Sequence, residues 1–444
     1  MVAPVLSTAN PPSWQQLMSG AAPFGNALTN VVGIKPSGLS VSNNSTAGRS
    51  WTLKMAAPGD FDAVRLVIYH GSTDATTVYQ AIVAATDEER NSTIAQVCRP
   101  IVSGVEYNTL NSTSEQYGWQ GIKWSGANTI TSAAGTSTVP VQNFSDWIPL
   151  SSIPRRDGTR FPLLLARISV TSGTSSFTTS TAAGTGMETA TSANGGFILQ
   201  GLFEADALGA MVTAPANNNF TQGGANFGTI TVGVQLRTRQ KGITLIGIGD
   251  SLTQNGSTAL LGDGFSSIGW RAAAAISALG VPCGYVNHGE ASQTMQTFQP
   301  PGISAITNWR PNAVFMQAFS PNNSYSSAGV ARYQLQQQGG LTEEVISSCV
   351  AINAAPFVAT GIPSSTSVIA TAAIDDLRKS YNEKIRAKVF NTFILDWDQL
   401  LSNNQTPARL LSAYDNGDQV HPNATAIGLQ ASQLTAKIRV AFGI

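Results

Sequence analysis

Charged side chains and cysteines are scarce in this sequence. Of its 444 residues, 11% are charged, and the formal net charge is zero. No basic patch occurs, and this absence argues against a nucleic-acid partner. The three cysteines, Cys98, Cys283 and Cys349, are far apart and odd in number. They predict neither a disulfide framework nor a metal site, no cofactor is expected, and we interpret them as small buried apolar residues.

Long apolar runs are absent as well. The start, Met1-Val2-Ala3-Pro4, lacks the positive charge and the apolar stretch of a signal peptide, and no run approaches the length of a membrane span. We therefore expect no membrane partner, and either a cytoplasmic origin or a signal that was removed. Serine, threonine, asparagine, glycine and alanine are abundant instead. That composition is typical of β-rich extracellular or virion proteins.

Residues 46–240 contain short runs rich in Val, Ile, Thr and aromatic residues, with Gly, Asn, Asp and Ser between them. The pattern predicts an all-β accessory domain, a β-sandwich of the jelly-roll type. Residues 1–45 show little periodicity and are predicted to be an extended N-terminal arm. The predicted strands are 51–55, 63–69, 77–84, 121–124, 161–170, 197–203 and 228–236, and the predicted long loops are 171–196 and 215–226.

Strand-like and helix-like segments alternate in residues 241–444, after the polar boundary Arg239-Gln240-Lys241. Such alternation predicts right-handed crossovers and an α/β domain with a doubly wound parallel sheet. The predicted strands are 243–248, 284–287, 313–319, 357–360 and 392–396. The predicted helices are 268–279, 341–353, 374–388 and one that begins at 424.

Two motifs in this second region carry chemistry. An apolar strand ends at Gly249-Asp250-Ser251-Leu252, which places Ser251 where open α/β sheets bind ligands. A serine hydroxyl needs a base, usually histidine, before it attacks a carbonyl. Of the three histidines, only His421 has a carboxylate, Asp418, three residues before it. The sequence therefore offers a nucleophile, a base and a carboxylate that orients the base.

These motifs resemble the first and last blocks of the GDSL, or SGNH, hydrolases, a family of serine esterases and acylhydrolases. The resemblance covers about residues 241–444 and implies a three-layer α/β/α domain with a five-stranded sheet. It also implies an acyl-enzyme mechanism with Ser251, His421 and Asp418 as the catalytic triad. Some members of the family orient the histidine through backbone carbonyls, which would lessen the share of Asp418.

The two middle blocks of the family are degraded in this sequence. Aligned on Asn287 and Thr294, the glycine of the oxyanion hole falls on Ser292. The third block reads Ser320-Pro321-Asn322-Asn323, which places Asn322 in the oxyanion position and leaves Asn323 as the alternative. The resemblance thus implies an oxyanion hole formed by the backbone N–H groups of Ser251 and Ser292 and the Asn322 amide.

The substrate is less sharply indicated. Tryptophans of the first region either stack on sugars or fill a core; they are Trp14, Trp51, Trp119, Trp124 and Trp147. Because an all-β domain beside such an esterase resembles a carbohydrate-directed module, we expect the hydrolysis of short acyl esters, acetyl above all, on a polysaccharide. A general carboxylesterase or lipase remains an alternative, as does an inactive virion or surface glycan-binding protein. A trimeric tail-type assembly also stays open.

Overall fold

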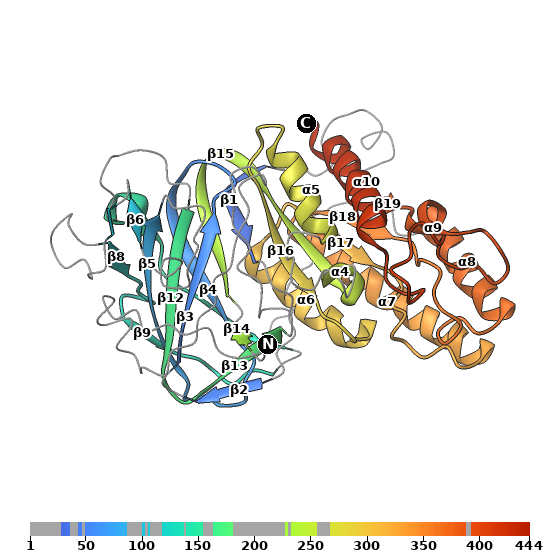
Figure 1. Ribbon diagram of the computed structural model, residues 1–444, viewed down its shortest axis with the longest axis horizontal. Coiled ribbons are helices and arrows are strands. Elements are labelled where there is room, and N and C mark those ends of the chain that lie inside the picture. The colour runs from blue at the N-terminus through green and yellow to red at the C-terminus, as the bar shows by residue number, and fades with distance from the viewer. Residues whose placement is uncertain are drawn as a thin grey trace, which may run out of the picture.

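The computed structural model describes residues 28–35, 43–46, 49–86, 100–102, 105–106, 118–136, 139–153, 163–180, 227–229, 232–254, 267–387 and 392–444. Along the longest axis of the molecule, a strand-rich region lies beside a region that contains most of the helices (Figure 1). The predicted strand 197–203, the predicted loop 215–226, Trp14 and Cys98 lie outside the described residues, as does most of the predicted arm.

The strand-rich region contains two larger groups of antiparallel strands. The first has the order β3, β12, β5, β8, with β9 beside β5. The second has the order β10, β4, β15, with β1 beside β15 and β11 beside β4. Their bounds are β1 Thr29–Ile34, β3 Arg49–Ala56, β4 Phe61–His70, β5 Val78–Thr86, β8 Trp119–Gly121, β9 Thr129–Thr131, β10 Val141–Phe144, β11 Ile148–Pro149, β12 Leu163–Ser172 and β15 Val232–Gly249.

Shorter elements complete this region. They are β2 Asn43–Thr46, β13 Thr174–Ser180 and β14 Phe227–Thr229, which form a three-stranded sheet, the pair β6 Ile101–Val102 and β7 Val105–Glu106, and the 3-10 turn η1 Leu150–Ser152. The two larger groups share one hydrophobic core, because Leu66 of β4 and Val234 of β15 belong to the same buried cluster as Tyr79 and Val83 of β5 and Ile168 of β12. Five of the seven predicted strands overlap observed strands over several residues. The predicted strand 121–124 shares only Gly121 with β8, and 197–203 lies outside the described residues.

Strand β15 joins the two regions. Its first half pairs with β4 and β1 in antiparallel fashion, and its second half pairs with parallel strands. The predicted boundary at residues 240/241 falls inside it, where Arg239, Gln240 and Lys241 are exposed but remain in the strand. Backbone hydrogen bonds maintain the strand there, since Arg239 N–H donates to the carbonyl of Asp60 at 2.9 Å. The division of the chain into an arm and two domains stays a prediction, although β1 places residues 29–34 in the main sheet.

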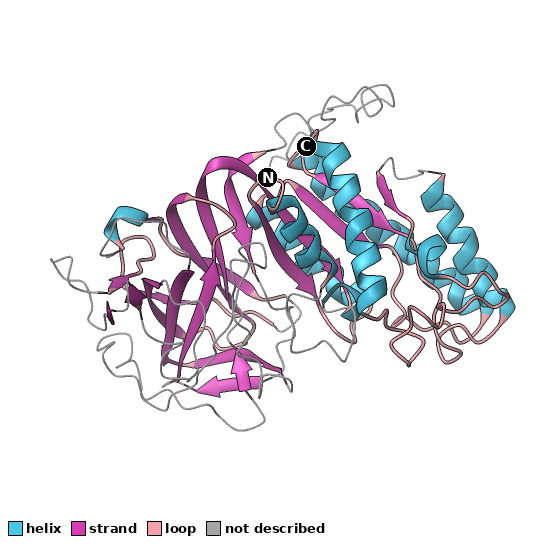
Figure 2. Ribbon diagram, turned by 45° about the horizontal axis from the view of Figure 1, so that its top comes forward, coloured by secondary structure: helices cyan, strands magenta, loops and turns pink. Residues whose placement is uncertain are grey.

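The second region is built on five parallel strands in the order β16, β15, β17, β18, β19. Alternate residues of β15 face opposite sides: Leu245 belongs to the core with α5 and α10, and Ile246 to the core with α6, α7 and α8. Helices thus cover both faces (Figure 2). The bounds are α4 Ser251–Gln254, α5 Ile268–Ser277, β16 Cys283–Gly289, α6 Met295–Trp309, β17 Ala313–Gln317, α7 Ala328–Ala351, β18 Ala355–Ala359, α8 Ala372–Arg386, β19 Phe393–Leu395, α9 Trp397–Leu401 and α10 Ala424–Phe442.

Two helices differ from the prediction. Helix α6 was not expected, because Pro300 and Pro301 stand inside it and proline removes N–H donors from a helix. It persists because Phe298, Ile306 and Trp309 are buried against the sheet. Helix α7 begins 13 residues before the predicted start at 341, since its buried face overrides the cost of a glycine pair in the middle.

Buried aromatic and sulfur side chains settle two open points of the sequence. Trp119 and Trp124 are buried, which favours the core interpretation of these two rings over sugar stacking. The ring of Trp147 instead lies under two guanidinium groups. Cys283 and Cys349 are buried free thiols, as expected. Among the residues that the structure describes, no helix is both long and apolar enough to cross a membrane.

Candidate active site

The nucleophile candidate lies at the carboxyl edge of the parallel strands. Strand β15 ends at Gly249, which pairs with Gly289 of β16, and Ser251 begins the short helix α4. A Cβ on Gly249 would collide with the side-chain oxygens of Gln317 and Thr253. Glycine therefore lets the chain turn close to its neighbours, and this turn leaves the Ser251 hydroxyl half-buried at the edge of the sheet.

Hydrogen bonds to the Asp250 carboxylate stabilise the Ser251 turn. The carboxylate is fully buried, with one oxygen accepting from the Leu252 N–H at 2.9 Å and the other from the Ser320 hydroxyl at 2.6 Å. The Asp250 N–H donates to Gln317 Oε1 at 3.0 Å. Burial raises the pKa of Asp250 above its ordinary value, although these hydrogen bonds oppose the shift. The carboxylate thus ties the Ser251 turn to the loop after β17.

A tight turn before α10 presents the base. The Asp418 Oδ1 atom accepts from the N–H groups of Val420 and His421 at 2.9 and 2.8 Å. Between Asp418 and Val420, Gln419 adopts a left-handed backbone with φ of 57°. The turn is anchored at its end by Asn423, which caps α10 by accepting from the N–H groups of Thr425 and Ala426. The second motif therefore folds as one local unit.

The two motifs meet in a line of three side chains. His421 Nε2 lies 2.8 Å from Ser251 Oγ, and His421 Nδ1 lies 2.6 Å from Asp418 Oδ2. Burial alone would raise the pKa of Asp418, but the hydrogen bonds from His421 and Val420 outweigh it and hold that pKa below its usual value. Asp418 is therefore an ion wherever histidines titrate.

The other two histidines lie elsewhere. His70 contacts the Tyr79 hydroxyl at 2.7 Å, on the strand-rich side. His288 is fully buried, with Nε2 2.9 Å from the Tyr69 hydroxyl, and burial lowers its pKa well below the ordinary value. Among the described residues, only His421 reaches the serine.

Ser292 lies in a loop beside the nucleophile turn. It is exposed, and its backbone is left-handed with φ of 63°, a conformation that favours glycine. That geometry fits the position at which the GDSL/SGNH hydrolases, which this sequence resembles, have glycine. The preceding residue, Ala291, donates its N–H to Gln254 Oε1 of α4 at 2.9 Å, which fixes the loop against the helix of the nucleophile.

The two asparagines of the third block have different surroundings. Asn322 is exposed, and its amide donates to the carbonyl of Gln293 at 3.0 Å, in the same loop as Ser292. Asn323 is buried and has its amide occupied: Oδ1 accepts from the Met295 N–H, and Nδ2 donates to Gln296 and to a glutamine of α7. Of the two, Asn322 has the accessible amide on the side of the Ser292 loop.

A chain of hydrogen bonds behind this loop was missed by the sequence analysis. Asn287 at the end of β16 donates from its amide to the carbonyl of Gln254 at 2.9 Å. The Asn287 carbonyl accepts from the buried ammonium of Lys35 at 2.6 Å. Lys35 follows β1, so the strand-rich side of the chain reaches the base of the candidate oxyanion loop. No motif marks an isolated lysine 216 residues before the serine, whereas Gln254, three residues after Ser251, sits within one helical turn of it.

Glu290 is the first residue of the same loop, directly after β16. Its side chain is buried, and burial raises its pKa to about 7, although the positive charge of Lys35 opposes the shift. Burial also lowers the pKa of Lys35, against the opposing charge of Glu290. The candidate oxyanion loop thus lies beside a buried lysine and a buried glutamate, and burial disfavours the charged form of each.

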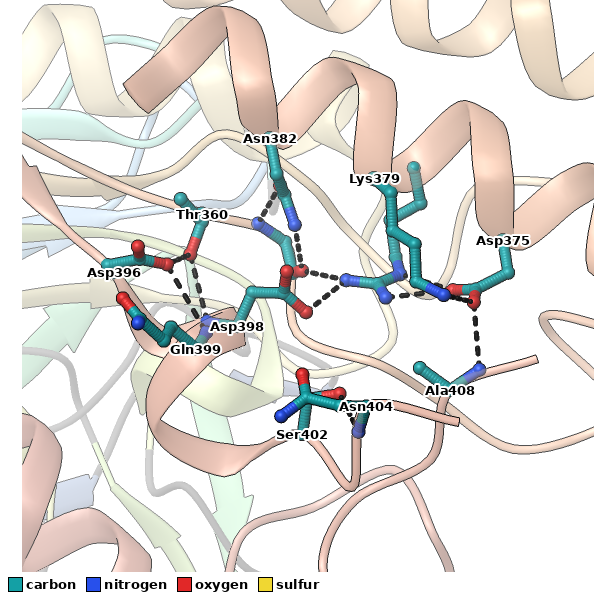
Figure 3. Close-up of polar contacts among 12 residues, drawn as sticks. Thr360, Asp375, Lys379, Asn382, Asp396, Asp398, Gln399, Ser402, Asn404 and Ala408 are labelled. Carbon is teal, nitrogen blue, oxygen red and sulfur yellow. Dashed lines mark hydrogen bonds and ion pairs between the residues drawn. The ribbon is translucent and has the colours of Figure 1, made fainter. Parts of the chain in front are cut away.

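A second cluster of ionisable groups lies beyond the carboxyl ends of β18 and β19 (Figure 3). The Arg378 guanidinium donates to Asp398 at 2.5 Å, to the carbonyl of Gly361 at 2.6 Å and to Asp375 at 2.8 and 3.0 Å. The other oxygen of Asp375 accepts from the Ala408 N–H at 2.8 Å. The cluster joins α8, α9 and the segment that follows β18. Among the described residues, no group of three His, Cys, Asp or Glu side chains could hold a metal ion.

No family model and no curated protein match this chain. Among solved structures, it is similar to a protein described as lipolytic, of the G-D-S-L family, from Desulfitobacterium hafniense DCB-2, with 18% identity and a TM-score of 0.35 over 44% of this chain and 98% of that one. For a GDSL-like lipase from Bacteroides thetaiotaomicron VPI-5482, the identity is 15% and the TM-score is 0.32, over 45% of this chain and 88% of that one. For an acetyl xylan esterase, the identity is 15% and the TM-score is 0.33, over 43% of this chain and 98% of that one. Because these identities and TM-scores are low, the assignment of the site rests on the distances within this chain.

Proposed function

We propose that this protein is a serine carboxylic ester hydrolase. The observation that carries the proposal is the line from Ser251 Oγ through the His421 imidazole to the Asp418 carboxylate, with contacts of 2.8 and 2.6 Å. Nucleophile, base and orienting acid in that order are the arrangement that acyl transfer needs. The three side chains come from two segments 167 residues apart in the sequence, so local sequence alone does not account for their meeting.

The mechanism follows from these contacts. With the Nδ1 proton donated to Asp418, His421 Nε2 is free to accept the Ser251 proton as the hydroxyl oxygen attacks the ester carbonyl. The protonated imidazole then gives that proton to the leaving alcohol. Water hydrolyses the acyl-serine in a second round through the same base, and the Asp418 carboxylate stabilises the imidazolium in both.

The tetrahedral intermediate needs donors directed at its oxyanion. We assign this role to the backbone N–H groups of Ser251 and Ser292 and to the Asn322 amide. One N–H of the Asn322 amide donates to the carbonyl of Gln293, and we assign its second N–H to the oxyanion. Catalytic hydrogen bonds often tighten only in the complex with substrate.

A short acyl group on a glycan is the substrate that fits best. Among the described residues, the two oxyanion candidates Ser292 and Asn322 and the turn residue Gln419 are exposed and polar. A long acyl chain would need an apolar wall there, because burying methylenes supplies its binding energy. We further propose that the two antiparallel strand groups form a β-sandwich accessory to this site, supported by their common core.

Hydrolysis of p-nitrophenyl esters tests the proposal. We expect measurable turnover of the acetate, declining activity from acetate to butyrate to dodecanoate, and a loss of about 10³-fold or more in Ser251→Ala. Turnover that rises with chain length would instead indicate a lipase. A protein that cleaves none of the three would be a binding protein without esterase activity, and the proposal would fail.

A further inference from the structure

A row of carboxamides extends from the oxyanion loop to the surface of α7. Asn323 Nδ2 donates to the Oε1 atoms of Gln296 and Gln334, at 2.8 Å each. Gln296 Nε2 donates to Gln334 Oε1 at 3.2 Å and to Gln337 Oε1 at 3.1 Å. Gln337 Nε2 donates to the Tyr333 hydroxyl at 2.6 Å. We call these five residues the amide row.

The inner end of the amide row belongs to the proposed active site. Asn323 is the neighbour of Asn322, whose amide lies on the Ser292 loop. Gln296 is in the first turn of α6, directly after that loop. The row therefore begins beside the candidate oxyanion position and continues to Tyr333 through hydrogen bonds between neighbouring side chains. Its five side chains carry no charge.

The outer end of the amide row is exposed, and its side chains are hydrogen-bonded to one another. Tyr333 is 57% exposed, and among the described residues it is the one aromatic side chain among the exposed large apolar groups. Its ring is held by the bond from Gln337 on the next turn of α7. No described residue accepts a hydrogen bond from Gln334 Nε2, and the Tyr333 hydroxyl proton is also uncommitted. Asn323 already ties α6 to α7 from the buried end, so the outer residues add little to that contact.

This combination suits a sugar chain. An exposed ring offers a flat apolar face with a polar tip, and carboxamides supply donors and acceptors together in a fixed plane. Side chains that are already held by one another lose little freedom when a ligand binds. Because the row has no charge, it favours a neutral glycan over an acidic one.

We propose that the amide row is a glycan subsite, in which Tyr333 stacks on a sugar ring and Gln334 and Gln337 bind hydroxyls next to the esterified unit. The proposal rests on the proposed esterase function, since it names the substrate as a neutral O-acylated polysaccharide. It assigns to α7 a role in recognition that the triad does not need for the chemistry.

Kinetics on a small and a polymeric ester separate this role from catalysis. In Tyr333→Ala, we expect the p-nitrophenyl acetate rate to stay within twofold of the wild type, while the KM for a soluble acetylated xylan rises roughly 3- to 10-fold, the size of one aromatic contact. Tyr333→Phe keeps the ring and should stay near the wild type. Val350→Ala removes another exposed apolar side chain of α7 and serves as the control.

Binding measured without turnover keeps the subsite testable apart from the esterase activity. Ser251→Ala should bind acetylated xylan in affinity electrophoresis, and Ser251→Ala with Tyr333→Ala should bind it several-fold more weakly. This comparison holds even if the wild type cleaves no ester, a result that would overturn the proposed function alone. Equal xylan binding or equal KM with and without the Tyr333 ring would overturn the subsite. A loss confined to acetylated pectin, an acidic glycan, would overturn the preference for a neutral chain.

Discussion

Two clusters of ionisable groups lie at the same edge of one sheet, and they differ in how their hydrogen bonds end. In the line of Asp418, His421 and Ser251, each group contacts the next, and the line ends at the half-buried serine hydroxyl. In the cluster around Arg378, the guanidinium is 1% exposed and bonds to Asp375, Asp398 and a carbonyl. One arrangement ends at a reactive group, and in the other the buried guanidinium makes four hydrogen bonds to neighbouring oxygens.

The difference separates chemistry from stability. A buried ion that is fully paired has no capacity left for a substrate, but removing one partner leaves an uncompensated charge in the interior. A partly exposed line has little to lose in folding energy, because water replaces a lost contact. We therefore expect mutations in the first cluster to abolish activity at unchanged stability, and mutations in the second to do the reverse.

The largest effect is expected in the triad. Ser251→Ala and His421→Ala should each lower kcat on p-nitrophenyl acetate by about 10³-fold or more, because no other serine–histidine pair can replace them. The thermal midpoint should shift by no more than the error of the scan. Near wild-type turnover in either variant would remove that residue from the mechanism.

Breaking the buried cluster should have the opposite signature. Arg378→Met removes the buried cation between Asp375 and Asp398, which keep their contacts with the partly exposed Lys379 and Arg386, and we expect a loss of roughly 1–3 kcal/mol in the free energy of unfolding. The kcat of the folded fraction should stay within a few-fold of the wild type. Urea denaturation followed by fluorescence measures the first quantity.

The matched control for that variant is Arg239→Met. The Arg239–Asp62 pair has a contact of 2.8 Å but is more than half exposed on both sides, so its loss should leave the unfolding midpoint unchanged. Equal midpoints for Arg378→Met and Arg239→Met would show that the buried cluster is not a stabilising one.

The adjacent asparagines sharpen the comparison within a single loop. Asn322→Ala should lower kcat by roughly 10²–10³, the cost of one oxyanion donor, at nearly constant stability. Asn323→Ala removes an amide with three hydrogen bonds, so it should lower stability by about 1–3 kcal/mol and affect kcat much less. The reverse result would mean that the third block aligns one residue later.

The sequence predicted the parallel region well because its strands are apolar runs between helices. The five predicted strands from 243 to 396 overlap β15, β16, β17, β18 and β19. Helix α6 was missed because two prolines contradict local propensity, and only the burial of its apolar face reveals it. The junction at β15 was also beyond a sequence pattern, since three exposed residues look like a linker until their backbone partners are known.

The site was predictable only as far as it is local. Asp418 and His421 lie in one turn, and Ser251 follows a strand, so their roles could be inferred from motifs. The supporting groups could not. Lys35 and Gln254 reach the oxyanion loop through contacts that depend on how β1 and α4 pack, and neither residue belongs to a chemical motif.

The pH dependence of activity tests which member of the triad titrates. The pKa of Asp418 lies below its usual range, so acidification from pH 8 to 5 leaves this carboxylate ionised. Protonation of the base is then the event that stops catalysis, and kcat/KM should fall about tenfold per pH unit on the acid limb. A profile that is flat between about pH 5 and 8, where histidines titrate, contradicts a histidine base. A twofold steeper limb would show that a second group titrates with the base, and Glu290 is the candidate because burial raises its pKa to about 7.

The smallest effect is expected at Ser292, where strain and chemistry can be separated. A left-handed serine costs roughly 1–2 kcal/mol, and glycine removes that cost while losing part of the gain to its greater freedom in the unfolded chain. Ser292→Gly should therefore raise the free energy of unfolding by about 0.5–1 kcal/mol, with kcat unchanged because the backbone N–H remains. Ser292→Ala keeps both the N–H and the strain, so its stability and its kcat should match the wild type. If Ser292→Ala lowers kcat as much as Asn322→Ala does, the hydroxyl of Ser292 takes part in the reaction, and the donor in this loop is a side chain and not the backbone.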